Sequence, residues 1–132
     1  MPRIDKYRGK VADELSRMSV SDSLPMLTSR ARRTLTRVAK NKSLQVKKLM
    51  KKVSAMKDAA KVIRTQVREA VIVPEWLGRT FAVHNGKEWK NVHVSVDKLG
   101  YRLGDFSHTT GRVLHSGPGV GATRGSKFIP LK

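Results

Sequence analysis

Between positions 81 and 96 the chain alternates apolar and polar residues with a period of two, the clearest pattern in the sequence. The apolar row lies on both sides of the dipeptide Asn85-Gly86 and consists of Phe81, Val83, Val92, Val94 and Val96. Such alternation buries one face of a strand, and Asn-Gly supplies the two positive φ angles of a type I′ turn. The stretch therefore predicts a β-hairpin with an opposite polar row of His84, Asn91, His93 and Ser95.

The first half of the chain instead shows the spacing of three and four residues that is typical of amphipathic helices. It predicts a short helix over 11–20, a helix over 30–38 and a longer helix over 43–60. Thr28 or Ser29 is expected to cap the second helix, and Ser21 or Ser23 a short turn before it. Residues 1–10 have no period, so they are interpreted as a basic arm.

Two further segments complete the predicted core. Residues 61–69 alternate in the manner of a third strand, which would project Arg64 and Arg68. After the hairpin, Asp97 can cap a single helical turn that places Leu99 and Leu103 under the sheet. The glycine-rich sequence after Phe106 is too poor in apolar residues to fold alone, so we expect it to become ordered only on a partner.

Together these elements predict an α+β fold. We expect a small three-stranded sheet with flanking helices, a basic helical N-terminal extension and an extended glycine-rich C-terminal tail. The predicted boundaries are 1–60 for the extension, 61–106 for the α+β core and 107–132 for the tail. Only seven of the 132 residues are Phe, Trp or Tyr, which predicts a thin core.

The charge of the chain narrows the range of possible functions. Lys and Arg number 28 against 10 Asp and Glu, and the resulting net charge of +18 repels itself unless an anion neutralises it. Eleven basic residues and no acidic one lie between Arg30 and Lys57. A solvated helix face is the simpler interpretation of a charge run, but solvated faces usually mix both signs. A polyanion is therefore the predicted partner.

Several other functions are disfavoured by the residues. The chain has no cysteine, which fits a reducing cytoplasm, and no apolar run long enough to cross a bilayer, so no membrane partner is expected. The spacing of the four histidines matches no compact zinc site, the tail glycines match neither phosphate-loop pattern, and no nucleophile elbow occurs. Neither enzyme activity nor a bound metal or cofactor is predicted.

Trp76 and Trp89 are candidate platforms on which unpaired bases could stack. For Trp76, which follows Pro74, burial at one end of the sheet is the favoured alternative. For Trp89 the two interpretations are evenly balanced. The tail glycines would allow backbone N–H groups to approach phosphates closely.

Three motifs in a fixed order are similar to those of a known family. They are Pro74-Glu75-Trp76 with Gly78, the segment from Val83 to Lys87 with its Asn-Gly-Lys turn, and the segment from Gly100 to Phe106. With the ending from His115 to Lys132, they resemble the universal small-subunit ribosomal protein family numbered nineteen (fifteenth in eukaryotic naming), in its archaeal and eukaryotic branch. The sequence departs from the usual family residues at Trp76, Tyr101, Asp105 and Thr110.

The resemblance implies a structural constituent of the head of the small ribosomal subunit, without catalytic turnover, that binds small-subunit rRNA. It also implies a neighbouring head protein of the thirteenth family (eukaryotic eighteenth), and a tail that reaches toward the decoding site and the A-site tRNA. A free nucleic-acid-binding protein outside the ribosome is the alternative, because the charge fits it equally well.

The side chains predicted to contact RNA are basic residues of the helices, the core and the tail, together with polar groups at the hairpin and in the tail. They are Arg30, Arg32, Arg33, Arg37, Lys47, Lys48, Lys51, Arg64, Arg68, Arg79, His84, Asn85, Lys87, Arg102, His108, Arg112, His115, Arg124 and Lys127.

Overall fold

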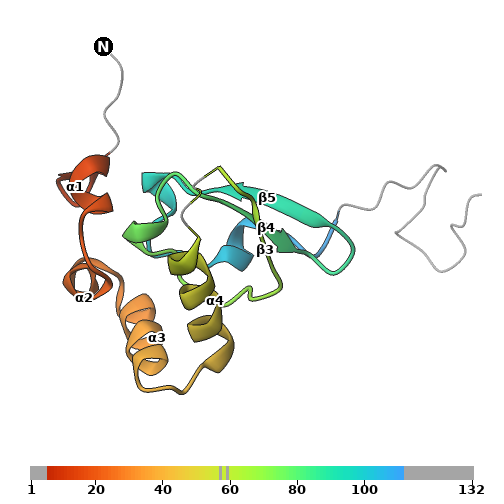
Figure 1. Ribbon diagram of the computed structural model, residues 1–132, viewed down its shortest axis with the longest axis horizontal. Helices are drawn as coiled ribbons and strands as arrows, with labels where there is room; N and C mark the ends of the chain where they lie inside the picture. The colour runs from red at the N-terminus through yellow and green to blue at the C-terminus, as the bar shows by residue number, and fades with distance from the viewer. Residues whose placement is uncertain (1–5, 57, 59, 112–132) are drawn as a thin grey trace, which may run out of the picture.

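The computed structural model describes residues 6–56, 58 and 60–111, which form an α+β fold (Figure 1). Within these ranges the helices are α1 (Ala12–Ser16), α2 (Val20–Ser23), α3 (Ser29–Ala39) and α4 (Leu44–Ala55). One sheet pairs β1 (Lys6–Tyr7) with β2 (Lys10–Val11), and a second contains β3 (Ile63–Thr65), β4 (Thr80–His84) and β5 (Trp89–His93). The predicted α+β class is thus confirmed for the described residues.

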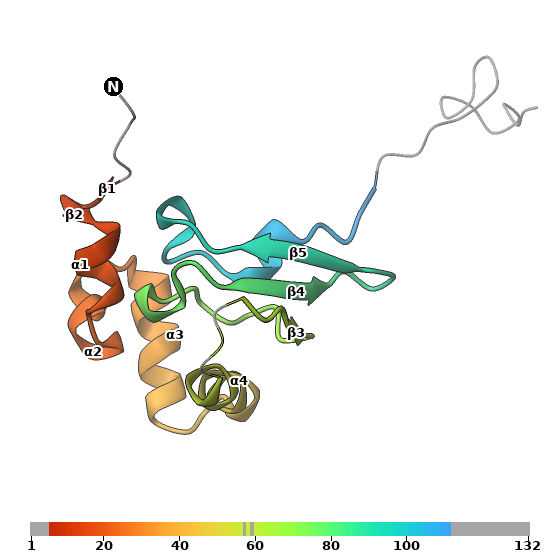
Figure 2. The ribbon, with the colours of Figure 1, turned by 45° about the horizontal axis from the view of Figure 1, so that its top comes forward.

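The larger sheet contains the predicted hairpin and third strand in the order β3-β4-β5. Strand β3 is parallel to β4, and β4 is antiparallel to β5. Phe81, Ala82 and Val83 of the central strand β4 are all buried, although only Phe81 and Val83 belong to the predicted apolar row. The turn between β4 and β5 points away from α1 and α2 (Figures 1 and 2).

The hairpin turn differs from the predicted type I′ turn. His84 pairs with Trp89, so four residues form the loop, and among them only Gly86 has a positive φ, of 104°. The side-chain oxygen of Asn85 accepts hydrogen bonds from the backbone N–H groups of Lys87 (2.9 Å) and Glu88 (2.7 Å). Asn85 therefore closes the loop through its side chain. An Asn-Gly pair is compatible with this four-residue loop as well as with a two-residue turn, so the sequence alone does not separate the two.

The N-terminal segment is more ordered than predicted. Where a basic arm was expected, residues 6–11 form the β1–β2 hairpin, whose turn residues Arg8 and Gly9 both have positive φ. The helix predicted over 11–20 is limited to α1, and Ser19 caps α2 by accepting from the Asp22 N–H. Ser23, one of the two predicted caps, is the N-cap residue of the 3-10 helix Leu24–Met26, but its side chain makes no capping hydrogen bond. Elements of two to five residues are too short for hydrophobic periodicity to define.

The two longer helices follow the predicted pattern more closely. Thr28 caps α3 by accepting from the Ala31 N–H, as predicted. Helix α4 ends at Ala55, five residues before the predicted end. The buried residues of both helices recur at a spacing of three or four, namely Ala31, Leu35 and Val38 in α3 and Val46, Leu49 and Val53 in α4. This spacing leaves the basic residues of both helices on their outer faces.

Two predictions around the sheet need correction. The strand predicted over 61–69 is limited to Ile63–Thr65, because the Thr65 hydroxyl then accepts from the Val67 N–H and the chain turns. The single turn after the hairpin is the 3-10 helix Val96–Lys98, whose N-cap position is Ser95 rather than Asp97. Leu99 and Leu103 are buried, as predicted.

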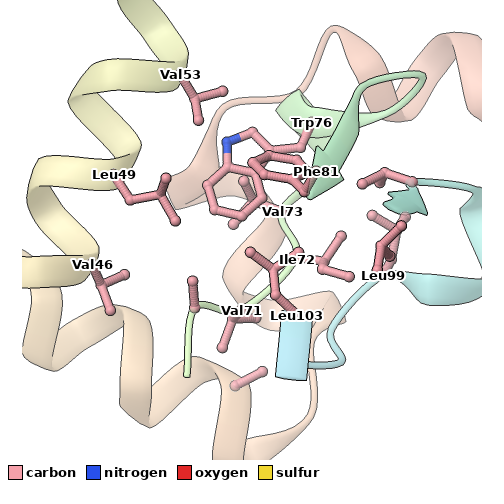
Figure 3. Packing of buried hydrophobic residues seen from close by; sticks show 14 of the residues in the cluster. Val46, Leu49, Val53, Val71, Ile72, Val73, Trp76, Phe81, Leu99 and Leu103 are labelled. Atoms are coloured by element: carbon pink, nitrogen blue, oxygen red, sulfur yellow. The ribbon is translucent and has the colours of Figure 1, made fainter. Parts of the chain in front are cut away.

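Among the described residues, one apolar cluster of 21 buried residues connects the helices to the sheet. Figure 3 shows Leu49 and Val53 of α4 facing Trp76 and Phe81. The Trp76 side chain is 2% exposed and its ring centroid lies 5.0 Å from that of Phe81, which confirms its burial at the sheet. Trp76 is therefore a core residue rather than a stacking platform.

The packed structure continues one residue past Phe106. Ser107, the first residue of the predicted tail, is buried, and its hydroxyl donates to the carbonyl of Val83 at 3.2 Å. Residues 112–132, which make up most of the predicted tail, lie outside the described residues.

Candidate nucleic-acid interface

Helix α3 and the loop after it form a cationic depression, here called the α3 groove. It is lined by Arg32, Arg33, Arg37, Lys40 and Lys42, together with Ser29 and Thr36. None of these lining residues is acidic. Because the opposite side of α3 is buried in the core, its basic side chains point outward, where an anion can reach them.

A second depression lies where α4 approaches the sheet, and it is here called the α4–β3 groove. Its walls include Lys48 and Lys52 of α4, Arg64 of β3 and Trp89 of β5. Lys48 and Lys52 are four residues apart, so they are neighbours on the helix surface. Figure 2 shows α4 on the β3 side of the sheet. The groove therefore combines three cations with an aromatic ring.

Arg68, in contrast, uses its guanidinium inside the protein. Its Nη1 donates to the carbonyl of His84 (2.6 Å), and its Nη2 donates to the carbonyls of Gly104 (2.9 Å) and Ser107. These acceptors belong to the end of β4, to the 3-10 helix Leu103–Phe106 and to the residue that follows it. Arg68 thus joins segments that are distant in sequence, a role that its predicted position on a strand did not indicate.

The close packing around Arg68 makes Gly104 sensitive to substitution. A Cβ atom at Gly104 would lie 3.0 Å from both the Cβ and the carbonyl oxygen of Arg68. We expect Gly104→Ala to lower the free energy of unfolding by about 1–3 kcal/mol, the usual cost of overpacking, as measured by urea denaturation. Gly111→Ala is the matched control, because a Cβ there meets nothing within 4 Å. Equal stability of the two variants would contradict this packing.

Two other arginines that were predicted to contact RNA are half-buried in the protein. Nη2 of Arg79 donates to the carbonyl of Met56 at 3.0 Å and so ties the end of α4 to the start of β4. Arg102 is half-buried and precedes the 3-10 helix Leu103–Phe106, where its backbone N–H donates to Asp105. Nη1 of Arg79 and Nε of Arg102 are buried and have no partner among the described residues.

The remaining predicted residues fall into three groups. Arg32 donates to the carbonyls of Leu24 and Leu27, Lys47 to the side chain of Asn41, and His84 and Asn85 accept from backbone N–H groups of the hairpin loop. Exposed side chains without a hydrogen bond among the described residues are those of Arg30, Arg33, Arg37, Lys48, Lys51, Arg64, Lys87 and His108. Arg112, His115, Arg124 and Lys127 lie outside the described residues.

Comparison with known proteins places the chain in a family. The family model described as Ribosomal protein S19 matches residues 37–115. The small ribosomal subunit protein uS19 of Methanococcus maripaludis is 40% identical over 131 residues, covering 96% of this chain and 81% of the relative. The protein of the same name from Halobacterium salinarum is also 40% identical, over 126 residues that cover 96% of this chain and 90% of the relative. The chain belongs to the ribosomal protein S19 family.

This membership confirms the resemblance that the sequence motifs indicate. The matched range of the S19 family begins within α3 and includes α4 and the whole larger sheet, so both grooves contain residues of the family region. In the part of the chain that the structure describes, no helix is long and apolar enough to cross a membrane.

The structure adds residues that the sequence prediction for this S19-family chain missed. Lys40, Lys42 and Lys52 line the two grooves but were not selected as candidate contacts. Helical spacing could have found two of them, since Lys40 is three residues after Arg37 and Lys52 is four after Lys48. Lys42 follows the helix in a loop, so no periodic signal identifies it.

Proposed function

We propose that this S19-family chain is a structural protein of the small-subunit head whose cationic grooves neutralise phosphates of rRNA. The chain is a small-subunit ribosomal protein, not an enzyme, and its partners therefore include ribosomal RNA and other ribosomal proteins. The observation that supports phosphate neutralisation is the composition of the α3 groove and the α4–β3 groove. Their lining residues include eight Lys and Arg and no acidic residue.

The mechanism is electrostatic and geometric. Each Lys or Arg that contacts a phosphate releases condensed counterions from the RNA, so binding weakens as salt increases. A-form RNA exposes phosphates and 2′-hydroxyls rather than distinctive base edges, so we expect little sequence preference on duplex segments. The protein in turn gains stability, because phosphates relieve the repulsion among its like charges.

The proposal extends to the neighbours of the chain. On the basis of the family resemblance, we assign it a contact with a head protein of the thirteenth family and a tail directed toward the decoding site and the A-site tRNA. One feature of the described residues supports different neighbours for the tail and for the N-terminal helices. The C-terminal end of the described part leaves the sheet on the side away from α1 and α2 (Figure 1). The last described residues therefore lie at the end of the sheet that is farther from the N-terminal helices.

Removing two charges of the tail should change the salt dependence of RNA binding. Replacing Arg124 and Lys127 by Ala is expected to reduce the slope of log affinity against log salt by roughly 0.7–0.9 for each phosphate that is no longer neutralised. The measurement is a titration of a small-subunit rRNA fragment at several salt concentrations. An unchanged slope would show that neither side chain binds a phosphate.

Sedimentation of a cell lysate tests the proposed function itself. We expect the chain to sediment with small subunits and to remain bound through a moderate-salt wash, because its grooves are embedded in RNA. A free nucleic-acid-binding protein would instead stay near the top of the gradient after the wash. That result would contradict the proposal.

A further inference from the structure

We propose that the α4–β3 groove binds one unpaired nucleotide of RNA. Its base stacks on the Trp89 ring, and its flanking phosphates lie against Lys48, Lys52 and Arg64. This inference rests on the proposed function, because it specifies which element of RNA one of the two cationic grooves holds. It goes beyond phosphate neutralisation, since it predicts a preference for single-stranded over duplex RNA.

The first support is the exposure of Trp89. Its side chain is 41% exposed, whereas the other tryptophan of the chain, Trp76, is 2% exposed in the core. The ring of His84 lies 4.9 Å from that of Trp89 at an interplanar angle of 65°, an edge-on contact that helps to hold the Trp89 ring in place. A ring that is already positioned loses less conformational freedom when a base stacks on it.

The second support is the face of the sheet on which Trp89 lies. Arg64, Ala82 and Asn91 are aligned across the three strands, and His84, two residues after Ala82, pairs with Trp89, two residues before Asn91. Because strand residues alternate between faces, these five positions share one face. Arg64, Trp89 and Asn91 are exposed, whereas His84 is half-buried and Ala82 is buried. The face therefore carries an exposed aromatic ring beside polar groups. Unpaired RNA bases stack on aromatic rings of this kind.

The third support is the chemistry of the groove walls. Lys48, Lys52 and Arg64 are exposed, and no residue that lines the groove carries a carboxylate. The amides of Gln45 and Gln66 also line it, and each offers one acceptor and two donors, which match the edges of a base. This concentration of cations favours RNA over an apolar protein surface as the occupant.

A duplex cannot use this groove in the same way, because its bases are already stacked on one another. Phosphates of a duplex can still contact the three cations. The site therefore predicts that Trp89 contributes to the affinity for single strands and not to the affinity for duplexes. It also predicts that removing the ring leaves the salt slope unchanged, because the three cations still neutralise the same phosphates.

The experiment compares binding of the full chain to a single-stranded RNA of about ten nucleotides and to a duplex of the same length. We expect the single strand, but not the duplex, to quench the emission of Trp89. Trp89→Ala should weaken single-strand binding by roughly 5- to 150-fold, Trp89→Phe should retain most of it, and duplex binding should be unchanged in both variants. Circular dichroism and thermal unfolding verify that both variants are folded.

Tyr101→Ala is the matched control, because Tyr101 is an exposed aromatic residue (56%) that does not line this groove. We expect it to bind the single strand as the unmodified chain does. Wild-type affinity of Trp89→Ala, or an equal loss in Tyr101→Ala, would overturn the inference. So would a Trp89→Ala variant that binds RNA normally but no longer binds another ribosomal protein. Failure of the unmodified chain to bind either RNA would instead contradict the proposed function.

Discussion

Replacing Arg33, Arg37, Lys40 and Lys42 by Gln is expected to weaken rRNA binding by roughly three orders of magnitude at about 0.1 M salt. All four side chains line the α3 groove. If each neutralises one phosphate, the slope of log affinity against log salt falls by about 0.7–0.9 per phosphate, so by roughly 2.8–3.6 for the four together. At about 0.1 M salt the logarithm of the salt concentration is about −1, so a fall of that size in the slope lowers the log affinity by about the same number of units. Titration of an rRNA fragment at several salt concentrations measures both quantities.

The same variant should be at least as stable as the unmodified chain. Arg33 and Arg37 are four residues apart on α3, and removing such a like-charged pair relieves about 0.2–0.5 kcal/mol of repulsion. Weaker binding by an equally stable variant cannot be explained by unfolding. The control replaces Lys6 and Arg17 by Gln, because neither residue lines either groove. If the control lowered the slope as much as the groove variant, the α3 groove would have no special role.

Arg68→Ala is expected to lower the free energy of unfolding by about 3–5 kcal/mol. The substitution removes charge-assisted hydrogen bonds to the carbonyls of His84, Gly104 and Ser107. Each such bond contributes roughly 1.5–3 kcal/mol, and the half-buried position of Arg68 and the shared network reduce the sum. Arg68→Lys should recover only part of the loss, because an ammonium group lacks the planar fork that reaches several acceptors at once.

Urea denaturation tests this prediction through the midpoint of unfolding, with an unchanged m-value if the folded and unfolded states keep their surface areas. Arg64→Ala is the matched control, since Arg64 lies four residues earlier and its exposed side chain has no hydrogen bond among the described residues. We expect it to change stability by no more than about 0.5 kcal/mol. Equal midpoints for the two alanine variants would show that Arg68 does not hold these segments together.

The parts of the fold that the sequence predicts well are those with a sustained period and a local cap. Helix α3 has both, since Leu35 and Val38 repeat at helical spacing and Thr28 provides the cap. The role of Arg68 has no such local signal, because its three acceptors lie 16, 36 and 39 residues further along the chain. Only the packing of β4 against the segment after Arg102 brings them together.

In the candidate site, too, some features have a local sequence signal and others depend on long-range packing. Helical phase places Arg33 and Arg37 on the surface, and composition alone predicts an anionic partner. For Trp89, however, the sequence leaves burial and stacking equally open, and its 41% exposure excludes only the burial. The groove around Trp89 is formed where α4 packs beside β3, and the buried α4 residues Leu49 and Val53 belong to the core cluster rather than to any pattern near the ring.

The structure of small subunits that contain this chain, determined by electron cryomicroscopy, tests the central claim most directly. We predict rRNA phosphate oxygens at hydrogen-bond distance, about 2.7–3.2 Å, from basic side chains of both the α3 groove and the α4–β3 groove. Grooves that face solvent, or that are covered by another protein with no phosphate in reach, would contradict the account.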